Sequence, residues 1–293
     1  MAHGRPLMEL VREAAEYLRR KGIKTPRLDA EVLMAHALGC KRIDLYLRFD
    51  ELLLKEEVDV YRELVRRRGK REPVAYITGS KEFWSIPLRV DSRVLIPRPE
   101  TETLVEACLE ELREIASSSP NPLKAAEIGT GSGAVVIALA KEMGERVMWT
   151  ATDVSKEALD VARSNAELLH LEGRIQFIEG DGVSPLLGQG GFSLIVSNPP
   201  YVPTGELESL DPEVRLYEPK VALDGGPDGT RMISRLLAEA HMALVSGGKL
   251  VMEVAGDQRG KVEEMISRVG SWVQWGWKED LGGRPRVVWV RKG

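Results

Sequence analysis

The chain has 293 residues, 43% of them hydrophobic, which is enough for one large domain or two smaller ones with a substantial core. This composition excludes a mainly disordered protein. The longest unbroken apolar run, residues 134–140, is far shorter than the roughly 20 residues of a membrane helix. Residues 1–10 contain no apolar stretch of signal-peptide length, so we expect a cytoplasmic protein. Cys40 and Cys108 are too few for a disulfide framework or a zinc site.

The net charge of −4 is unevenly distributed. Residues 1–80 carry 17 Lys/Arg and 13 Asp/Glu, whereas residues 81–293 carry 24 and 32. A net negative charge over the larger part disfavours nucleic acid as a partner, because phosphate binding needs many basic contacts. The basic run RRRGKR at residues 66–71 is either a solvated helix end or a docking surface.

The N-terminal region, residues 1–72, is predicted to be a small helical bundle. Apolar residues recur at helical spacing near residues 7–18, 29–38 and 58–69. After this bundle, residues 74–78 (VAYIT) and 83–86 (FWSI) predict the two strands of a short hairpin that links two domains.

Residues 100–293 predict an α/β domain, because apolar strands alternate with helical patterns. A helix is expected from residue 100 to about 116, before a turn at 117–122. Strands are expected at 123–128, 146–152, 174–179, 192–197, 248–254, 272–277 and 286–291. Further helices are expected at 133–143, 155–169, 229–245 and 258–269. This order predicts a doubly wound, mostly parallel sheet whose last two strands form an antiparallel edge hairpin.

The first strand of this domain leads into a glycine loop, EIGTGSGA. Gly129, Gly131 and Gly133 permit a tight turn and the close approach of a ligand to the backbone. Asp153 ends the second strand, where an acidic residue can accept hydrogen bonds from ribose hydroxyls. Glu127 precedes the loop and can attract a cationic ligand. The pattern predicts a nucleoside cofactor, with a purely structural turn as the alternative.

Two cofactors fit this loop, a nicotinamide dinucleotide and S-adenosylmethionine. The G-x-G-x-G spacing is one residue shorter than the dinucleotide pattern G-x-G-x-x-G and favours S-adenosylmethionine. Asp181 and Gly182 follow the third strand at the same sheet edge. They either flank the adenine or form a plain polar turn.

The strand at 192–197 runs into Asn198-Pro199-Pro200-Tyr201. The two prolines lack a backbone N–H, so this segment presents mainly acceptors. The Asn198 side-chain oxygen and the Pro199 carbonyl can both accept from one NH₂ group, and Tyr201 offers a flat ring to it. Holding both N–H bonds directs the lone pair of a conjugated nitrogen toward a methyl donor. The segment therefore predicts nitrogen methylation, with Asn198, Pro199 and Tyr201 as the catalytic residues.

Together, the glycine loop and the NPPY segment resemble S-adenosylmethionine-dependent methyltransferases of the seven-stranded, Rossmann-like class I. Three further features narrow the resemblance: the helical N-terminal region, REPVAYITG at residues 71–79, and LIPRPETE at residues 95–102. Over essentially the whole chain they resemble the bacterial peptide chain release factor glutamine methyltransferases, the HemK/PrmC family.

The resemblance implies methylation of the glutamine in the Gly-Gly-Gln motif of class 1 release factors. It implies a docking bundle at 1–72, a hairpin linker at 73–99 and a methyltransferase domain at 100–293. The implied cofactor residues are Glu127, Gly129, Thr130, Gly131, Ser132, Gly133, Asp153, Asp181, Gly182 and Asn198. The implied substrate residues are Asn198, Pro199, Pro200 and Tyr201. Many relatives carry a larger, often aromatic residue against the adenine where this chain has Gly182.

Other functions fit parts of the pattern. They are a glutamine methyltransferase of a ribosomal protein, an N-methyltransferase of a nucleic-acid base amine, and a binding module without catalysis. None of the four histidines, His3 included, lies in either motif, so we expect catalysis by positioning without a general base. Arg98 either holds the cofactor or makes a structural ion pair. Residues 204–225 form either a lid or a mobile segment.

Overall fold

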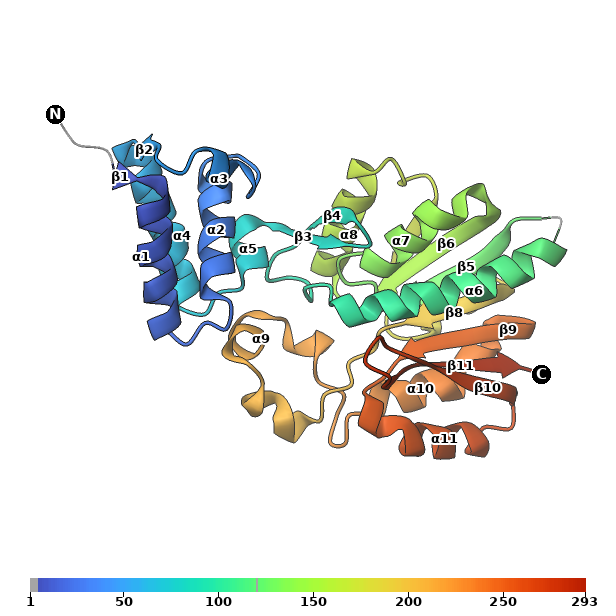
Figure 1. Cartoon of the computed structure of the whole chain (residues 1–293). Coiled ribbons are helices and arrows are strands. Elements are labelled where there is room, and N and C mark those ends of the chain that lie inside the picture. The colour runs from blue at the N-terminus through green and yellow to red at the C-terminus, as the bar shows by residue number, and fades with distance from the viewer. Residues whose placement is uncertain (1–4, 120) are drawn as a thin grey trace. The chain divides into compact units, whose positions relative to one another are not determined.

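A computed structural model describes residues 5–119 and 121–293 (Figure 1). The chain folds into two compact units. One comprises residues 5–80 together with the later segment Asp211–Tyr217, and the other comprises residues 81–210 and 218–293. A stretch of chain that follows the NPPY segment in sequence is therefore built into the N-terminal unit.

The N-terminal unit is a helical bundle, and the three helices predicted there are present. Its elements are β1 (Arg5–Pro6), α1 (Leu7–Arg20), α2 (Pro26–Ala37), α3 (Asp44–Leu47), β2 (Leu52–Leu53), α4 (Lys55–Gly69), α5 (Val74–Thr78) and α9 (Pro212–Tyr217). Its core is apolar because one face of each long helix is apolar, with Leu18, Leu33 and Met34 completely buried.

The prediction of a strand at residues 74–78 is wrong, because these residues form helix α5. Pro73 precedes the helix and Gly79 ends it in the left-handed conformation, with φ 71°. The β-propensity of the segment is overridden by burial of Ile77 in the bundle core. The linking hairpin lies further along the chain, as β3 (Ser80–Phe83) and β4 (Ile86–Arg89). Trp84 and Ser85, both with positive φ, make its turn, so the prediction of a strand at residues 83–86 is wrong as well.

The basic run is partly exposed, and Arg68 is its one buried residue. Arg68 is only 6% exposed, and its Nε donates to Asp29 Oδ2 over 2.7 Å. Its Nη2 donates to Glu213 Oε1 over 2.9 Å, and Arg71 donates to the other oxygen of Glu213 over 2.8 Å. Arg66, by contrast, is exposed and pairs with Glu63. The sequence analysis offered two interpretations of the run, a solvated helix end and a docking surface, and both place it at the surface. For Arg68 both are wrong, because its side chain is buried.

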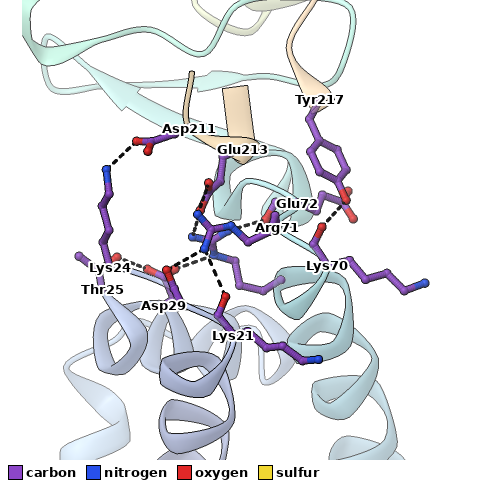
Figure 2. Close-up of polar contacts among 12 residues, drawn as sticks. Lys21, Lys24, Thr25, Asp29, Lys70, Arg71, Glu72, Asp211, Glu213 and Tyr217 are labelled. Atoms are coloured by element: carbon purple, nitrogen blue, oxygen red, sulfur yellow. Dashed lines mark hydrogen bonds and ion pairs between the residues drawn. The ribbon is translucent and has the colours of Figure 1, made fainter. Parts of the chain in front are cut away.

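These ion pairs hold the segment Asp211–Tyr217 within the bundle (Figure 2). Its two ends add further contacts. Lys24 Nζ donates to Asp211 Oδ2 over 2.7 Å, and the Tyr217 hydroxyl donates to the Lys70 carbonyl over 2.9 Å. The segment is thus tied to α2, α4 and the turns beside them.

The second unit contains the predicted seven-stranded sheet, in the order β10-β11-β9-β8-β5-β6-β7. Its strands are β5 (Leu123–Ile128), β6 (Val147–Asp153), β7 (Ile175–Glu179), β8 (Phe192–Ser197), β9 (Leu244–Glu253), β10 (Trp272–Glu279) and β11 (Pro285–Lys292). Its helices are α6 (Glu102–Ser118), α7 (Ala134–Met143), α8 (Lys156–Leu168), α10 (Arg231–Glu239) and α11 (Arg259–Arg268). The edge hairpin of β10 and β11 is antiparallel, as predicted.

The largest differences from the predicted boundaries of this unit lie between α10 and β9. Helix α10 ends at Glu239 and strand β9 begins at Leu244, whereas the sequence pattern extended the helix to residue 245. Leu244 pairs with Phe192 of β8 and both side chains are buried in the same core. Strand pairing and burial therefore outweigh helical periodicity over these residues.

The sheet separates two apolar cores, one on each face. Residues of α6 and α7 belong to one core, and residues of α10 and α11 belong to the other (Figure 1). Strand β5 pairs with both β6 and β8, so the chain order reverses beside it. Open α/β sheets bind ligands beyond the carboxyl ends of the strands at such a reversal. In the part of the chain described, no helix is both long enough and apolar enough to cross a membrane.

Candidate functional site

A cavity of about 570 Å³ lies where β5, β6 and β8 end, within the range of small-molecule sites. Most of the predicted site residues line it: Glu127, Gly129, Thr130, Gly131, Ser132, Asp153, Asp181, Gly182, Asn198 and Pro200. Gly133, Pro199 and Tyr201 are not part of the lining but adjoin it in the chain. The glycine loop and the NPPY segment, about 70 residues apart in sequence, thus share one cavity.

The glycines of the loop fall into two kinds. Gly129 and Gly131 have φ of 74° and 53°, and a Cβ added at either would meet nothing within 4 Å. Gly133 also has positive φ, but a Cβ there would lie 3.0 Å from Ile137 Cδ1 and 3.2 Å from Ala162 Cβ. The first two glycines leave space in which a ligand can approach the backbone, whereas the third is required by helix packing.

Asp153, at the end of β6, holds the glycine loop in place. Its Oδ2 accepts the Gly131 N–H over 2.8 Å, and its Oδ1 accepts the Ser155 N–H over 2.9 Å. Burial raises the pKa of Asp153, while these backbone hydrogen bonds lower it. Each carboxylate oxygen retains a further lone pair for a ligand hydroxyl.

Glu127, the last residue but one of β5, is a buried carboxyl group. It is 2% exposed, and its Oε2 accepts the Thr130 hydroxyl over 2.5 Å and the Val136 N–H over 3.2 Å. Burial raises the pKa of Glu127 to about 8, although both hydrogen bonds lower it. Among the described residues, the groups that shift this pKa include no lysine or arginine. The site can therefore take the ammonium group of a ligand as the missing cation.

Replacing Glu127 by glutamine should stabilise the ligand-free protein in a pH-dependent way. The folded state holds the Glu127 proton up to about pH 8, whereas the unfolded chain releases it near its ordinary value of 4.5. The free energy of unfolding of the native protein should therefore fall as pH rises from about 5 to 8. Glutamine keeps both hydrogen bonds and removes this loss.

The measurement is the difference in Tm between this variant and the native protein from pH 5 to pH 9. The difference should grow up to about pH 8 and then level off, because Glu127 is ionised in both states above its raised pKa. A Tm difference that stays constant from pH 5 to pH 9 would show that the pKa of Glu127 is not raised in the folded protein.

The amide of Asn198, directly after β8, has a defined orientation. Its Nδ2 donates to Thr101 Oγ1 over 3.2 Å, which leaves the side-chain oxygen as the group available to accept from a ligand. Thr101 is 4% exposed and lines the cavity, at the end of the 3-10 turn Pro99–Thr101. Sequence reasoning missed Thr101, although it lies in the LIPRPETE segment that carried the resemblance.

Glu253, at the end of β9, is a second residue that sequence reasoning missed. It is 1% exposed, and the Tyr201 hydroxyl donates to its Oε1 over 3.4 Å. Burial raises the pKa of Glu253, while the Thr101 hydroxyl and Arg286 lower it. An acidic residue at the end of the strand next to β8 is the signal that could have indicated it.

The backbone of Tyr201 is fixed by a hydrogen bond from Gln258 and by close packing against Gly229. Gln258 Nε2 donates to the Tyr201 carbonyl over 3.0 Å and to the Gly229 carbonyl over 3.2 Å. A Cβ at Gly229 would lie 2.3 Å from the Tyr201 carbonyl oxygen, so only glycine allows this approach. Burial raises the pKa of Tyr201 well above its ordinary value, so its hydroxyl stays protonated and a donor.

Arg98 makes an ion pair and also lines the cavity. Its Nη2 donates over 2.5 Å to Oε1 of Glu218, which is 5% exposed. The other oxygen of Glu218 accepts the Ile96 N–H over 3.2 Å.

Residues 204–225 begin and end in ordered contacts, because Thr204 Oγ1 donates to Asp224 Oδ1 over 2.6 Å. Of the histidines, His3 lies outside the described residues.

Comparison with known proteins gives matches over nearly the whole chain. Residues 9–79 match the family described as PrmC N-terminal domain, and residues 108–210 match the methyltransferase small domain. A release factor glutamine methyltransferase from Rhodopirellula baltica is 41% identical, over 98% of this chain and 96% of that protein. One from Geobacter sulfurreducens is also 41% identical, over 94% and 93%.

Solved structures resemble the fold at lower identity. A methyltransferase from Pyrococcus furiosus is 21% identical with a TM-score of 0.50, covering 78% of this chain and 98% of that one. The human methyltransferase 10 domain containing protein is 14% identical with a TM-score of 0.52, covering 71% and 88%. At these identities the likeness concerns the fold alone, which is that of class I methyltransferases.

Proposed function

The chain belongs to the family of release factor glutamine methyltransferases, and from this we propose that it methylates the glutamine of the Gly-Gly-Gln motif in class 1 peptide chain release factors. The methyl group would come from S-adenosylmethionine and go to the side-chain amide nitrogen. One observation carries the proposal: Asn198 and Pro200 line the same cavity as Gly129 and Gly131.

The residues of the cavity fit S-adenosylmethionine. Open space over Gly129 and Gly131 suits a ligand lying on the loop, and Asp153 suits ribose hydroxyls. The buried carboxylate of Glu127 suits the ammonium of the methionine end. When bound, this cofactor supplies an electrophilic methyl group on a sulfonium. We assign Thr130, Ser132, Gly133, Asp181, Gly182 and Asn198 to the same cofactor site.

Asn198, Pro199, Pro200 and Tyr201 would hold the glutamine side chain. The Asn198 amide nitrogen donates to Thr101, so the Asn198 oxygen is the group left to accept from the substrate, and the Pro199 carbonyl would be the second acceptor. Two acceptors on one NH₂ group orient the nitrogen lone pair and disfavour its delocalisation into the carbonyl. No proton needs to leave before transfer, so catalysis rests on positioning.

Each of the three predicted regions would have its own role in the reaction. We propose that residues 1–72 dock the release factor, residues 73–99 link, and residues 100–293 carry out the transfer. The net positive charge of residues 1–80 supports a docking role for the bundle. Removing residues 1–72 should then raise the KM for the release factor, and an unchanged KM in a soluble truncated chain would refute that role.

Replacing Asp153 by alanine should weaken binding of S-adenosylhomocysteine, the demethylated cofactor, by about 10–150-fold. The change removes a charged acceptor and also releases the Gly131 N–H that positions the loop. Calorimetry on the purified variant gives the Kd. Asp160→Ala, at an exposed residue of α8 paired with Arg163, is the control and should bind normally. Equal affinity of the two variants would remove Asp153 from the site.

The direct test is transfer of a labelled methyl group from S-adenosylmethionine to a bacterial class 1 release factor. A release factor whose Gly-Gly-Gln glutamine is replaced by alanine runs beside it. Label that depends on this glutamine would establish reaction and target together. Equal labelling of both would contradict the target. No labelling, with cofactor binding intact, would contradict the substrate and direct the search to a ribosomal protein glutamine and then to a nucleic-acid amine.

A further inference from the structure

Gly182 is a glycine because an arginine from another element occupies the space beside it. Gly182 has φ +60°, and a Cβ there would lie 3.0 Å from both Cζ and Nη2 of Arg235 and 3.3 Å from its Nε. These three atoms belong to the guanidinium plane, so the group takes up the space into which a side chain at position 182 would extend. Arg235 comes from α10, more than 50 residues later in the chain.

The guanidinium is held in one orientation by hydrogen bonds at its edges. Nη1 donates to Asp181 Oδ2 over 2.6 Å, and Nε donates to Glu239 Oε1 over 3.1 Å. Nη2 adds a longer bond of 3.4 Å to the Asp181 carbonyl. All of these bonds lie in or near the plane of the group, so the flat face that is turned away from Gly182 remains available for stacking.

Arg235 also faces the cavity. It lines the cavity together with Gly182 and with Met232, which lies one turn earlier on the same face of α10. The side chain is 33% exposed, so a ligand can reach it. Val154, next to Asp153, lines the same cavity and is 54% exposed. This end of the site therefore offers a flat cation and two apolar side chains to a planar group.

We infer that the guanidinium of Arg235 is the platform on which the adenine of the cofactor stacks. It does so in place of a side chain at position 182. The inference rests on the proposed function, because it takes S-adenosylmethionine as the ligand. A guanidinium stacks well on a flat aromatic ring, and a neighbouring carboxylate fixes its orientation without covering its face.

The test is calorimetric binding of two probes, S-adenosylhomocysteine and 5′-methylthioadenosine, to the full chain. Both probes contain adenine and ribose, but the second lacks the amino-acid end. Arg235→Ala should weaken both by the same factor, about tenfold. Arg235→Lys should weaken both nearly as much, because an ammonium keeps the charge and loses the plane. Arg268→Ala is the control, since Arg268 also pairs with a glutamate on its own helix.

Three results would overturn the inference. Native affinity of Arg235→Ala would reduce Arg235 to a surface ion pair. Native affinity of Arg235→Lys would show that charge alone suffices. A loss confined to S-adenosylhomocysteine would place the contact at the amino-acid end. If the native protein bound neither probe, the proposed function itself would fail, which separates the two failures. Equal Tm values of the alanine variants at 235 and 268 exclude misfolding as the cause.

Discussion

Replacing Asn198 by alanine should lower kcat/KM for the release factor by about a thousandfold, the upper range for loss of one positioned hydrogen-bonding group. The Asn198 oxygen is the acceptor that Thr101 leaves free, and alanine removes it. The lost interaction orients the nitrogen lone pair, so the effect should fall on kcat rather than only on KM. Steady-state kinetics with labelled S-adenosylmethionine measures it.

Cofactor affinity separates this effect from collapse of the site. The Kd of Asn198→Ala for S-adenosylhomocysteine should stay within about tenfold of the native value, because only one hydrogen-bonding group is removed. Thr103→Val serves as the control for disturbance of the neighbouring turn, since Thr103 is also buried but does not line the cavity. Near-native turnover of Asn198→Ala would refute the role given to the NPPY segment.

Replacing Arg68 by alanine should destabilise the helical bundle by about 3–5 kcal/mol, the cost of breaking a buried ion pair from one side. Asp29 is 6% exposed and would lose its cation, keeping the Thr25 hydroxyl as a donor over 2.8 Å. Glu213 would keep only Arg71 (Figure 2). Hydrogen exchange of amides in α2 and α4 reports the change within this unit.

The same helix provides the matched control for Arg68. Arg66 is exposed and pairs with Glu63 three residues earlier, so Arg66→Ala should cost only about 0.2–0.5 kcal/mol. Exchange in Asp211–Tyr217 should rise in Arg68→Ala and stay unchanged in Arg66→Ala. Equal effects of the two substitutions would show that burial of Arg68 does not matter.

The α/β domain was predictable because its signals are local. The alternation of strands and helices, the glycine loop and the strand-terminal NPPY each lie within a few consecutive residues. Sheet edge and chain direction then place Gly129, Asp153 and Asn198 at one end of parallel strands. The same reasoning failed at Val74–Thr78, where β-propensity predicted a strand and burial of Ile77 produces a helix.

Contacts between residues distant in sequence were decided by the tertiary structure alone. Thr101 and Asn198 are 97 residues apart, and the Tyr201 hydroxyl meets Glu253 52 residues later. Arg68 belongs to a run whose sequence resembles a solvated helix end. Its side chain is nevertheless buried, because the later segment Asp211–Tyr217 packs into the same unit and Glu213 pairs with it. Nothing in the local pattern encodes such a pairing, because it depends on which side chains the packed elements bring together.

The sequence by itself determined which groups stand at the ends of the strands: the glycine loop after the first, Asp153 at the end of the second, and the NPPY segment after the fourth. These depend on backbone conformations that glycine and proline impose within a few residues. Tertiary structure decided which groups orient them, namely Thr101 behind Asn198 and Arg235 beside Gly182. A functional side chain keeps one orientation only when groups from other elements contact it, and only the packing of separate elements brings those groups together.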